Sequence, residues 1–409
     1  MFPLYLSFLL SGTDMKTFQC NCEDKPILFF ESNDCLACGK TVGIDDNFDQ
    51  VEPYEQDLKT GLFYKAANPT VHYKKCDNNE QFNACNGMVN LQTFVPDPEN
   101  EEILCFGCRF NETIPDLSIP EHIPLWNKME TAKRRALYTL KALPIPLVNI
   151  KEDPENGLSF DFITDRNVHD HFTTSIEGQE IVFTGHDNGH ITINLAEADD
   201  VSRSQAKHDM GERYRTLLGH FRHELGHYYF DQLVANSPGK YALCKQYFGD
   251  DELDYQEAMK VHYENGAPEN WRDLFISEYA TMHPYEDWAE TWAHYMHIID
   301  TLETAQNFSI AGSTTDNQTG TEELGELNLP QGACYFSSQT SMSDIIDTWM
   351  NFSVILNSLN RSMGLPDAYP FVLTQAVCTK LNFIHHAIHN KLHLLPVLAE
   401  TTTSQKSEI

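Results

Sequence analysis

The sequence predicts an α+β chain with three regions, and three observations support this prediction. Eight of the eleven cysteines lie within the first 108 residues, mostly as close pairs among Gly, Asn and Pro. The middle of the chain mixes segments of helical and of strand periodicity. The last part contains two more segments with helical spacing. We place the three regions at residues 16–115, 120–310 and 325–398.

The composition excludes several functions. The chain has 60 acidic and 28 basic residues and a formal net charge of -32, which argues against binding to nucleic acids or anionic membranes, because both require clustered Lys and Arg. No segment approaches about 20 uninterrupted apolar residues, so we expect no transmembrane helix. The apolar residues 1–10 lack the basic region of a signal peptide. Met15 is a candidate physiological start, and whether residues 1–14 belong to the native protein stays open.

Two sets of cysteines have spacings typical of zinc ribbons, because close pairs at strand turns can bring four thiolates to one tetrahedral ion. The first set has a C-x-C pair followed, after twelve residues, by a C-x2-C pair. In the second set only the last pair has the x2 spacing, so unpaired or partly disulfide-bonded cysteines remain an alternative there. Such clustering indicates metal binding in a reducing, cytoplasmic compartment. The predicted ligands are Cys20, Cys22, Cys35 and Cys38 for the first zinc, and Cys76, Cys85, Cys105 and Cys108 for the second.

Periodicity places helices and strands in the second and third regions. Apolar residues recur at helical spacing from Leu125 to Leu143, and Pro144 ends that helix. The segments that alternate as strands do are Phe160 to Ile163, Glu180 to Gly185 and His190 to Ala198. Further helices are expected at Arg213 to Val234, Ser277 to Ala305 with Pro284 near its first turn, Ser343 to Met363, and Phe371 to Leu392. The polar residues 309–326 are expected to form a flexible linker or surface loop.

A metal-binding motif lies on one of the predicted helices. The segment His223-Glu224-Leu225-Gly226-His227 has the form HExxH. Residues i and i+4 of a helix share one face, so both imidazoles can reach one zinc ion, while Glu224 projects toward the attacking water as general base. The alternative is that these histidines are merely packed or solvated.

The next predicted helix offers a third ligand, since a catalytic zinc usually has three protein ligands and one open position. Glu286 and Glu290 lie four residues apart in the segment HPYEDWAE. We expect Glu286 to bind the metal and Glu290 to accept the second ring N–H of a ligand histidine, which fixes the tautomer of that histidine. The reverse assignment and a solvated helix face remain alternatives.

Three other histidines and one strand are weaker candidates. His220 shares a helix face with His223, but three ligands from one helix would crowd the metal, so a supporting or packing role is preferred. His294 is a weaker ligand candidate, and His283 is a candidate for binding substrate. The strand from His190 to Leu195 alternates polar and apolar residues, so it either pairs with an extended peptide or lies inside a sheet.

These motifs resemble a known family. Between Trp126 and Ala305 the chain contains, in order, METAKRR, FTGH, ITINLAEADD, YRTLLGHFRHELGHYYFDQL, FGDD and ISEYATMHPYEDWAETWAHYMHI. This order resembles the zinc-binding metallopeptidases that carry an N-terminal zinc ribbon, and the resemblance covers most of residues 16–390. It implies a zincin-like metallopeptidase domain, preceded by four-cysteine zinc-ribbon modules and followed by a helical C-terminal region. It also implies a peptide or protein substrate.

A more distant resemblance is to the lethal-factor-like gluzincins, in which a tyrosine precedes the ligand glutamate by seven residues. Tyr279 and Glu286 match that spacing. The resemblance implies that Tyr279 donates a hydrogen bond to the oxyanion, whereas a tyrosine packed in the core is the alternative. The sequence therefore predicts a zinc metallopeptidase with one catalytic and two structural zinc ions. A catalytically inactive zinc-binding adaptor is the alternative from another functional class.

Overall fold

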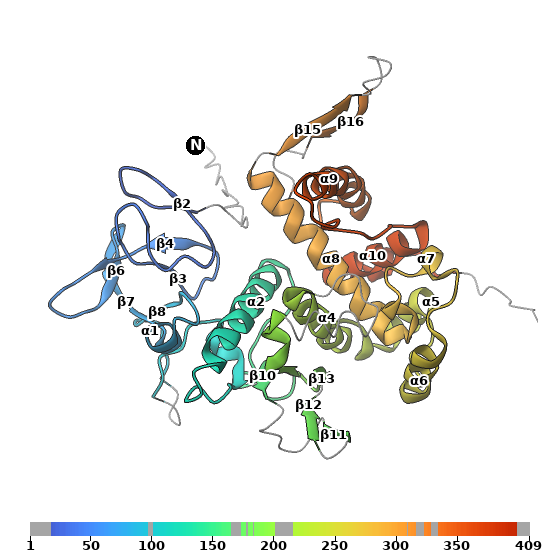
Figure 1. Cartoon of the computed structure of the whole chain (residues 1–409), viewed down its shortest axis with the longest axis horizontal. Coiled ribbons are helices and arrows are strands. Elements are labelled where there is room, and N and C mark those ends of the chain that lie inside the picture. The colour runs from blue at the N-terminus through green and yellow to red at the C-terminus, as the bar shows by residue number, and fades with distance from the viewer. Residues whose placement is uncertain are drawn as a thin grey trace, which may run out of the picture.

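The chain combines a small, strand-rich N-terminal region with a larger body of helices and one mixed sheet (Figure 1). The α+β fold class is thus as predicted, with the cysteine clusters at the N-terminus and helices at the C-terminus. Several segments discussed above lie outside the residues that the structure describes. They are residues 1–14, the predicted helix start at residues 213–215 and the last eleven residues. In the computed structural model the described residues are 18–96, 101–164, 173–176, 179–182, 184–200, 216–308, 310–315, 323–328 and 334–398.

The N-terminal region consists of short antiparallel strands that connect the cysteines. Strands of two or three residues bury little surface, so we expect this region to depend on its cysteine clusters for stability. The two-stranded pairs are β1 (Phe18–Gln19) with β2 (Ile27–Leu28), and β3 (Val42–Ile44) with β4 (Val51–Pro53). A four-stranded sheet follows, made of β5 (Glu55–Gln56), β6 (Phe63–Lys65), β7 (Asn68–Lys75) and β8 (Met88–Asn90), with α1 (Asp77–Phe82) between the last two.

The central sheet has four strands in the order β13, β14, β10, β9. The predicted strand from His190 to Ala198 ends early, because the Asn194 side chain accepts a hydrogen bond from the Ala196 amide and starts a 3-10 turn. Of the two alternatives for this strand, the structure shows the internal position, since β14 lies between β13 and β10. Their bounds are β9 (Asn111–Thr113), β10 (Ser159–Ile163), β13 (Gly185–Asp187) and β14 (His190–Asn194), beside a separate pair, β11 (Thr173–Ile176) and β12 (Gln179–Val182).

Three long helices carry the central motifs: α2 (His122–Ala142), α4 (Leu217–Phe230) and α8 (Pro284–Asn307). Helix α4 packs against α2, against α8 and against β13 of the sheet. Thr216 caps α4 by accepting a hydrogen bond from the Gly219 amide, and a π-helical turn from Asp231 to Ala235 follows its end. The predicted helix starting at Ser277 is wrong at its beginning. Extended His283 caps α8, Pro284 occupies its first turn, and Tyr279–Thr281 form a separate 3-10 turn.

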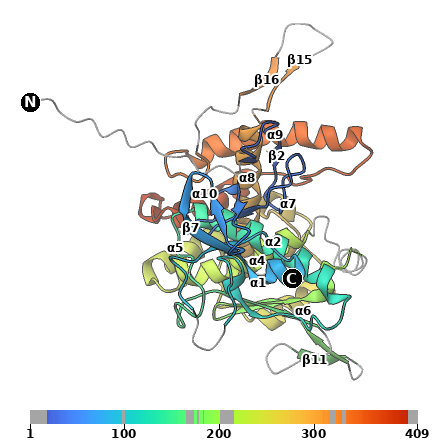
Figure 2. The same cartoon turned by 90° about the vertical axis from the view of Figure 1, so that its left-hand side faces the viewer.

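Three of the remaining helices, α5 (Pro238–Phe248), α9 (Met342–Ser362) and α10 (Gln375–Ile388), pack against α8 (Figure 2). The predicted C-terminal helices are present, although the second begins four residues later than expected because Thr374 caps it. A flexible linker or surface loop was expected at residues 309–326, but residues 311–315 and 323–328 pair as an antiparallel ladder that projects from the body in Figure 1. The other elements are α6 (Tyr255–Asn265), α7 (Trp271–Leu274), β15 (Ala311–Thr315) and β16 (Glu323–Asn328).

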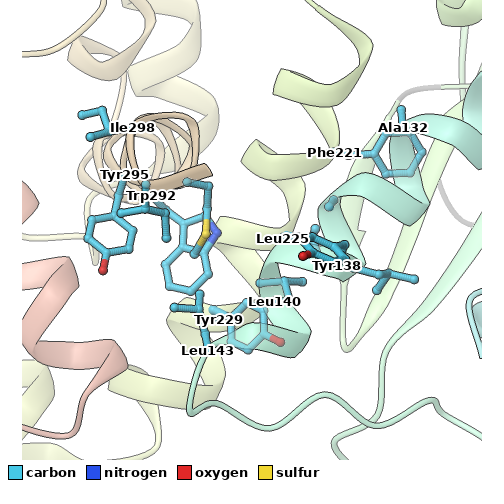
Figure 3. Packing of buried hydrophobic residues seen from close by; sticks show 14 of the residues in the cluster. Ala132, Tyr138, Leu140, Leu143, Phe221, Leu225, Tyr229, Trp292, Tyr295 and Ile298 are labelled. Atoms are coloured by element: carbon cyan, nitrogen blue, oxygen red, sulfur yellow. The ribbon is translucent and has the colours of Figure 1, made fainter. Parts of the chain in front are cut away.

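The core between α4 and α8 determines where the motif residues lie. Tyr229 of α4 stacks on Trp292 of α8 with ring centroids 4.9 Å apart (Figure 3). A Cβ atom added to Gly226 would lie only 2.9 Å from the Cα atom of Ala289, so the two helices touch backbone to backbone there. The indole N–H of Trp288 donates to the Gly226 carbonyl at 2.8 Å. A side chain at residue 226 would therefore force α4 and α8 apart.

Candidate metal centre and active site

Two histidines of α4 and one glutamate of α8 converge on a single point. The Nε2 atom of His223 lies 3.2 Å from Nε2 of His227 and 2.9 Å from Oε2 of Glu286. The third side of this triangle, from His227 Nε2 to Glu286 Oε2, measures 3.4 Å. All three residues are buried, with 2–8% of their surface exposed.

The triangle suits a zinc ion. Two ligands about 2.0–2.1 Å from a tetrahedral zinc lie roughly 3.3 Å apart, close to the three observed separations. The two imidazole nitrogens face each other, and Oε2 of Glu286 has no hydrogen-bond partner among the described residues. A buried carboxylate oxygen beside two inward-facing imidazole nitrogens is an arrangement in which one divalent cation can bind all three atoms at once.

Further side chains hold two of these candidate ligands in place. The Nδ1 atom of His223 lies 2.7 Å from Oε1 of Glu290, and the other oxygen of Glu290 accepts a hydrogen bond from Ser277 at 2.6 Å. The hydroxyl of Tyr255, at the start of α6, donates to Oε1 of Glu286 at 2.9 Å. Hydrogen-bonded partners of this kind orient metal ligands and adjust their basicity.

The carboxyl group of Glu224 lies beside the triangle with one oxygen engaged and one free. Its Oε1 atom lies 3.2 Å from Nε2 of His220, whose Nδ1 atom contacts Glu197. Its Oε2 atom is buried and has no partner within the described part of the chain. Burial raises the pKa of Glu224, but the neighbouring His220, His223 and His227 hold it below its ordinary value. The carboxylate form, which accepts protons, is thereby favoured.

The pKa of His220 differs from that of an ordinary histidine. Burial lowers its pKa, but the carboxylates of Glu197 and Glu224 raise it to about 9. It does not join the group of converging ligand atoms in the described residues, and neither does His294, whose Nδ1 atom lies 2.8 Å from the Tyr369 hydroxyl. His220 therefore interacts with Glu224 and not with the candidate metal position.

Tyr279 lies next to the triangle, outside α8. Its ring centroid is 5.8 Å from that of His223. Burial and the carboxylate of Glu286 hold the pKa of Tyr279 well above its usual range, so the phenol keeps its proton. His283, expected to bind substrate, is instead buried, caps α8 and hydrogen-bonds the Leu253 carbonyl at 3.2 Å.

Each of the two cysteine sets converges as well. Within each set the four sulfur atoms lie within 4.8 Å of one another, and all eleven cysteines are free of disulfide bonds. In the first set Cys38 is exposed and Cys22 partly exposed, whereas the second set is buried throughout. Burial raises the pKa of Cys35, but the backbone N–H groups of Cys38 and Ala37 lower this pKa to about 7. The lowered pKa favours the thiolate, which is the form that zinc binds.

The second set also contacts the helical body. The Cys108 sulfur lies 3.7 Å from a carboxylate oxygen of Glu130 on α2. The guanidinium of Arg134, one turn further along α2, contacts Asn86 and lies 5.2 Å from the ring centroid of Phe30. The zinc-ribbon region thus packs against a helix that itself packs on α4.

Comparison with known proteins identifies the family. Residues 122–387 match the family described as "Putative zinc-binding metallo-peptidase", and residues 17–119 match a zinc-ribbon domain. The chain belongs to this metallopeptidase family. It is 37% identical over 377 residues to uncharacterized proteins of Mycobacterium bovis and Mycobacterium tuberculosis, an alignment that covers 91% of this chain and 95% of each relative. No solved structure gives a significant match.

Membership of this metallopeptidase family agrees with the architecture and with the chemistry of the sites. The matched residues of the metallopeptidase include the HExxH motif and all three corners of the triangle, and both cysteine sets fall within the zinc-ribbon match. The family name and the cysteine clusters support zinc as the bound metal. Among the described residues no helix has the length and apolar character needed to cross a membrane.

Sequence reasoning missed three residues of this site: Tyr255, Ser277 and Glu197. Tyr255 begins an exposed helix, and its distance of 31 residues from Glu286 gives no periodic signal. Glu197 lies in the 3-10 turn after β14, where the strand was expected to continue. Only Ser277 could have been recognised from its neighbours in the sequence, since its hydroxyl accepts a hydrogen bond from the backbone N–H of Ala280 in the turn before α8.

Proposed function

We propose that this chain is a zinc-dependent peptidase that hydrolyses peptide bonds, with Glu224 as general base. The observation that supports this most is the free, buried Oε2 atom of Glu224 beside the triangle of His223, His227 and Glu286. A site that only stored metal would not need an unpaired carboxylate oxygen, which is costly to bury. A carboxylate that has to accept a proton needs such an oxygen.

The proposed chemistry assigns one role to each residue. Zinc held by His223, His227 and Glu286 would lower the pKa of a water molecule toward neutrality and polarise the scissile carbonyl. Glu224 takes a proton from the attacking water and passes it to the leaving amine. Tyr279 donates a hydrogen bond to the carbonyl oxygen as negative charge develops there.

The two cysteine sets belong to the same proposal as structural zinc sites, which gives three zinc ions per chain. Eight thiolate ligands require a reducing environment, and a cytoplasmic location is therefore part of the proposal. The acidic composition is consistent with a protein or peptide substrate and with no nucleic-acid or membrane partner. Metal analysis of the purified protein should return about three equivalents of zinc.

The test is cleavage of an unbiased peptide library by zinc-loaded protein, with the Glu224→Gln variant beside it. The wild-type chain should cleave a reproducible set of peptides, and Glu224→Gln should retain all its zinc while losing cleavage. Loss of zinc from the variant would make Glu224 a ligand and contradict its assigned role. Absence of cleavage by fully loaded wild-type protein would favour the inactive adaptor, with the ribbons as its functional part.

A further inference from the structure

A chain of polar contacts connects the central sheet to Glu224. The Thr184 hydroxyl, next to the edge strand β13, donates to Oε1 of Glu197. The other oxygen of Glu197 contacts Nδ1 of His220, and Nε2 of His220 lies 3.2 Å from Oε1 of Glu224. The side chains of these last three residues are largely buried, with 16%, 14% and 6% of their surface exposed.

The partners of His220 define its chemical state. Both ring nitrogens face carboxylate oxygens. An ionised carboxylate can accept hydrogen bonds but cannot donate them. The ring can satisfy both neighbours only by donating from both nitrogens, which makes it an imidazolium. Two charge-assisted hydrogen bonds then fix the ring between Glu197 and Glu224, and such bonds are roughly twice as strong as neutral ones.

The consequence for Glu224 is a single orientation. The terminal torsion of a glutamate is soft and nearly two-fold, so a carboxylate without a partner can turn either oxygen, or neither, toward a water molecule. His220 engages Oε1, whereas Oε2 has no hydrogen-bond partner among the residues that the structure describes. Building on the proposed peptidase function, we infer that His220 is a positioning residue that holds Glu224 in its proton-accepting orientation, with Glu197 as its anchor.

The anchor itself is fixed by the sheet. Glu197 lies in the 3-10 turn that Asn194 caps directly after β14. The backbone N–H of Asn194 donates a hydrogen bond to the Thr184 hydroxyl at 3.2 Å. That hydroxyl in turn donates to Glu197. The end of β14 therefore sets the direction of His220. A histidine that only packed against α2 or the sheet would need neither carboxylate.

Kinetics of His220→Gln and Glu197→Gln test this inference. Because general-base catalysis contributes about 10²–10⁴-fold, we expect His220→Gln to lower kcat by roughly 10- to 100-fold with KM changed less than about two-fold and zinc content unchanged. Glu197→Gln should have a smaller effect of the same kind, and the double variant should not add the two losses. The matched control is His385→Gln, which alters another buried histidine, on α10, outside the site.

Chemical rescue separates positioning from packing. In His220→Ala, added imidazole should restore part of kcat, and it should restore nothing in Glu224→Gln. If His385→Gln, compared at equal thermal stability, loses as much kcat as His220→Gln, or if His220→Gln loses zinc, the positioning role is overturned.

A readout without activity distinguishes failure of this inference from failure of the proposed function. Nitrogen NMR of zinc-loaded wild-type protein at pH 7 should show both ring nitrogens of His220 protonated, and Glu197→Gln should remove that state. A neutral, singly protonated ring in the wild type would overturn the inference even in an active enzyme. Doubly protonated His220 in a protein that cleaves no peptide would retain the hydrogen-bonded arrangement and reject the peptidase.

Discussion

His223 lies between two carboxylates of one helix: its Nδ1 atom is 2.7 Å from Glu290 and its Nε2 atom is 2.9 Å from Glu286. The two glutamates are four positions apart, so one turn of α8 places them at opposite edges of the same ring. A proton on Nδ1, shared with Glu290, leaves the lone pair of Nε2 available for a metal.

The first prediction concerns this pair. Glu290→Ala should lower zinc affinity at the catalytic site by roughly 10- to 100-fold, because the ring loses the partner that fixes its tautomer. Glu286→Ala should lower it further, since one of three ligands is lost. Competition with a chelator measures both, and Glu264→Ala, on the exposed helix α6, is the control. A greater loss of zinc with Glu290→Ala than with Glu286→Ala would reverse the roles of the two glutamates.

The second prediction separates the two tyrosines. Tyr279→Phe should lower kcat by roughly 10²-fold, the effect of one lost oxyanion donor, with zinc affinity and KM nearly unchanged. Tyr255→Phe removes the hydrogen bond to Glu286 and should instead weaken zinc binding. Unchanged turnover with lowered thermal stability in Tyr279→Phe would make that residue a packing tyrosine.

The third prediction concerns the buried ion pair that joins α10 to α8. Lys380 donates to Asp287 at 2.6 Å, and Asp287 is fully buried next to the candidate ligand Glu286. Lys380→Met should destabilise the fold by about 3–5 kcal/mol, because it leaves a buried carboxylate without its partner. Adding Asp287→Asn should recover much of that loss. Urea unfolding followed by tryptophan fluorescence measures the cycle, and additive losses would contradict the coupling.

The fourth prediction compares the cysteine sets. The second set is fully buried and contacts Glu130 on α2, whereas Cys38 of the first set is exposed. Cys108→Ser should therefore lower the unfolding temperature of the whole chain by roughly 5–10 °C, and Cys38→Ser by less. Each variant should lose about one equivalent of zinc. Equal, small shifts would mean that the ribbons unfold independently of the helical body.

The fifth prediction is a loss of stability in acid. Burial, with the nearby His389 and His386, lowers the pKa of His385 to about 3, and its Nδ1 atom lies 3.0 Å from the Tyr295 hydroxyl. The unfolded chain takes up this proton below pH about 6.5 and the folded chain does not, so stability falls as the pH drops from 6.5 toward 3. The loss reaches up to about 2 kcal/mol at pH 5. His385→Gln should reduce the difference in unfolding temperature between pH 7 and pH 5, and an unchanged difference would contradict the assignment.

Local patterns predicted much of this fold because the deciding interactions are themselves local. The HExxH residues depend only on helical spacing, and the i, i+4 glutamates of α8 follow the same rule. The helix starts were less accurate. Apolar periodicity continues across His283, but the extended conformation before Pro284 interrupts the helix and moves Tyr279 into a separate turn.

Tertiary packing decided the features that local patterns did not predict. The edge strand β13 has the sequence Gly-His-Asp, which lacks β-branched and aromatic residues, and it pairs only because a tight turn at Asn188 and Gly189 returns the chain. Tyr255 and Glu197 reach the site through loop geometry that no spacing encodes. The position of β14 inside the sheet likewise depends on its parallel pairing with β10, over thirty residues earlier in the chain.

The backbone contact at Gly226 has a consequence for engineering and for sequence searches. Because a missing side chain sets the closest approach of α4 and α8, the separation of the two helices depends more directly on residue 226 than on the apolar residues packed further along them. Hydrophobic residues further along both helices can then be exchanged for others of equal volume without displacing the triangle. A search pattern that treats the fourth position of HExxH as arbitrary would accept chains that cannot bring these two helices together.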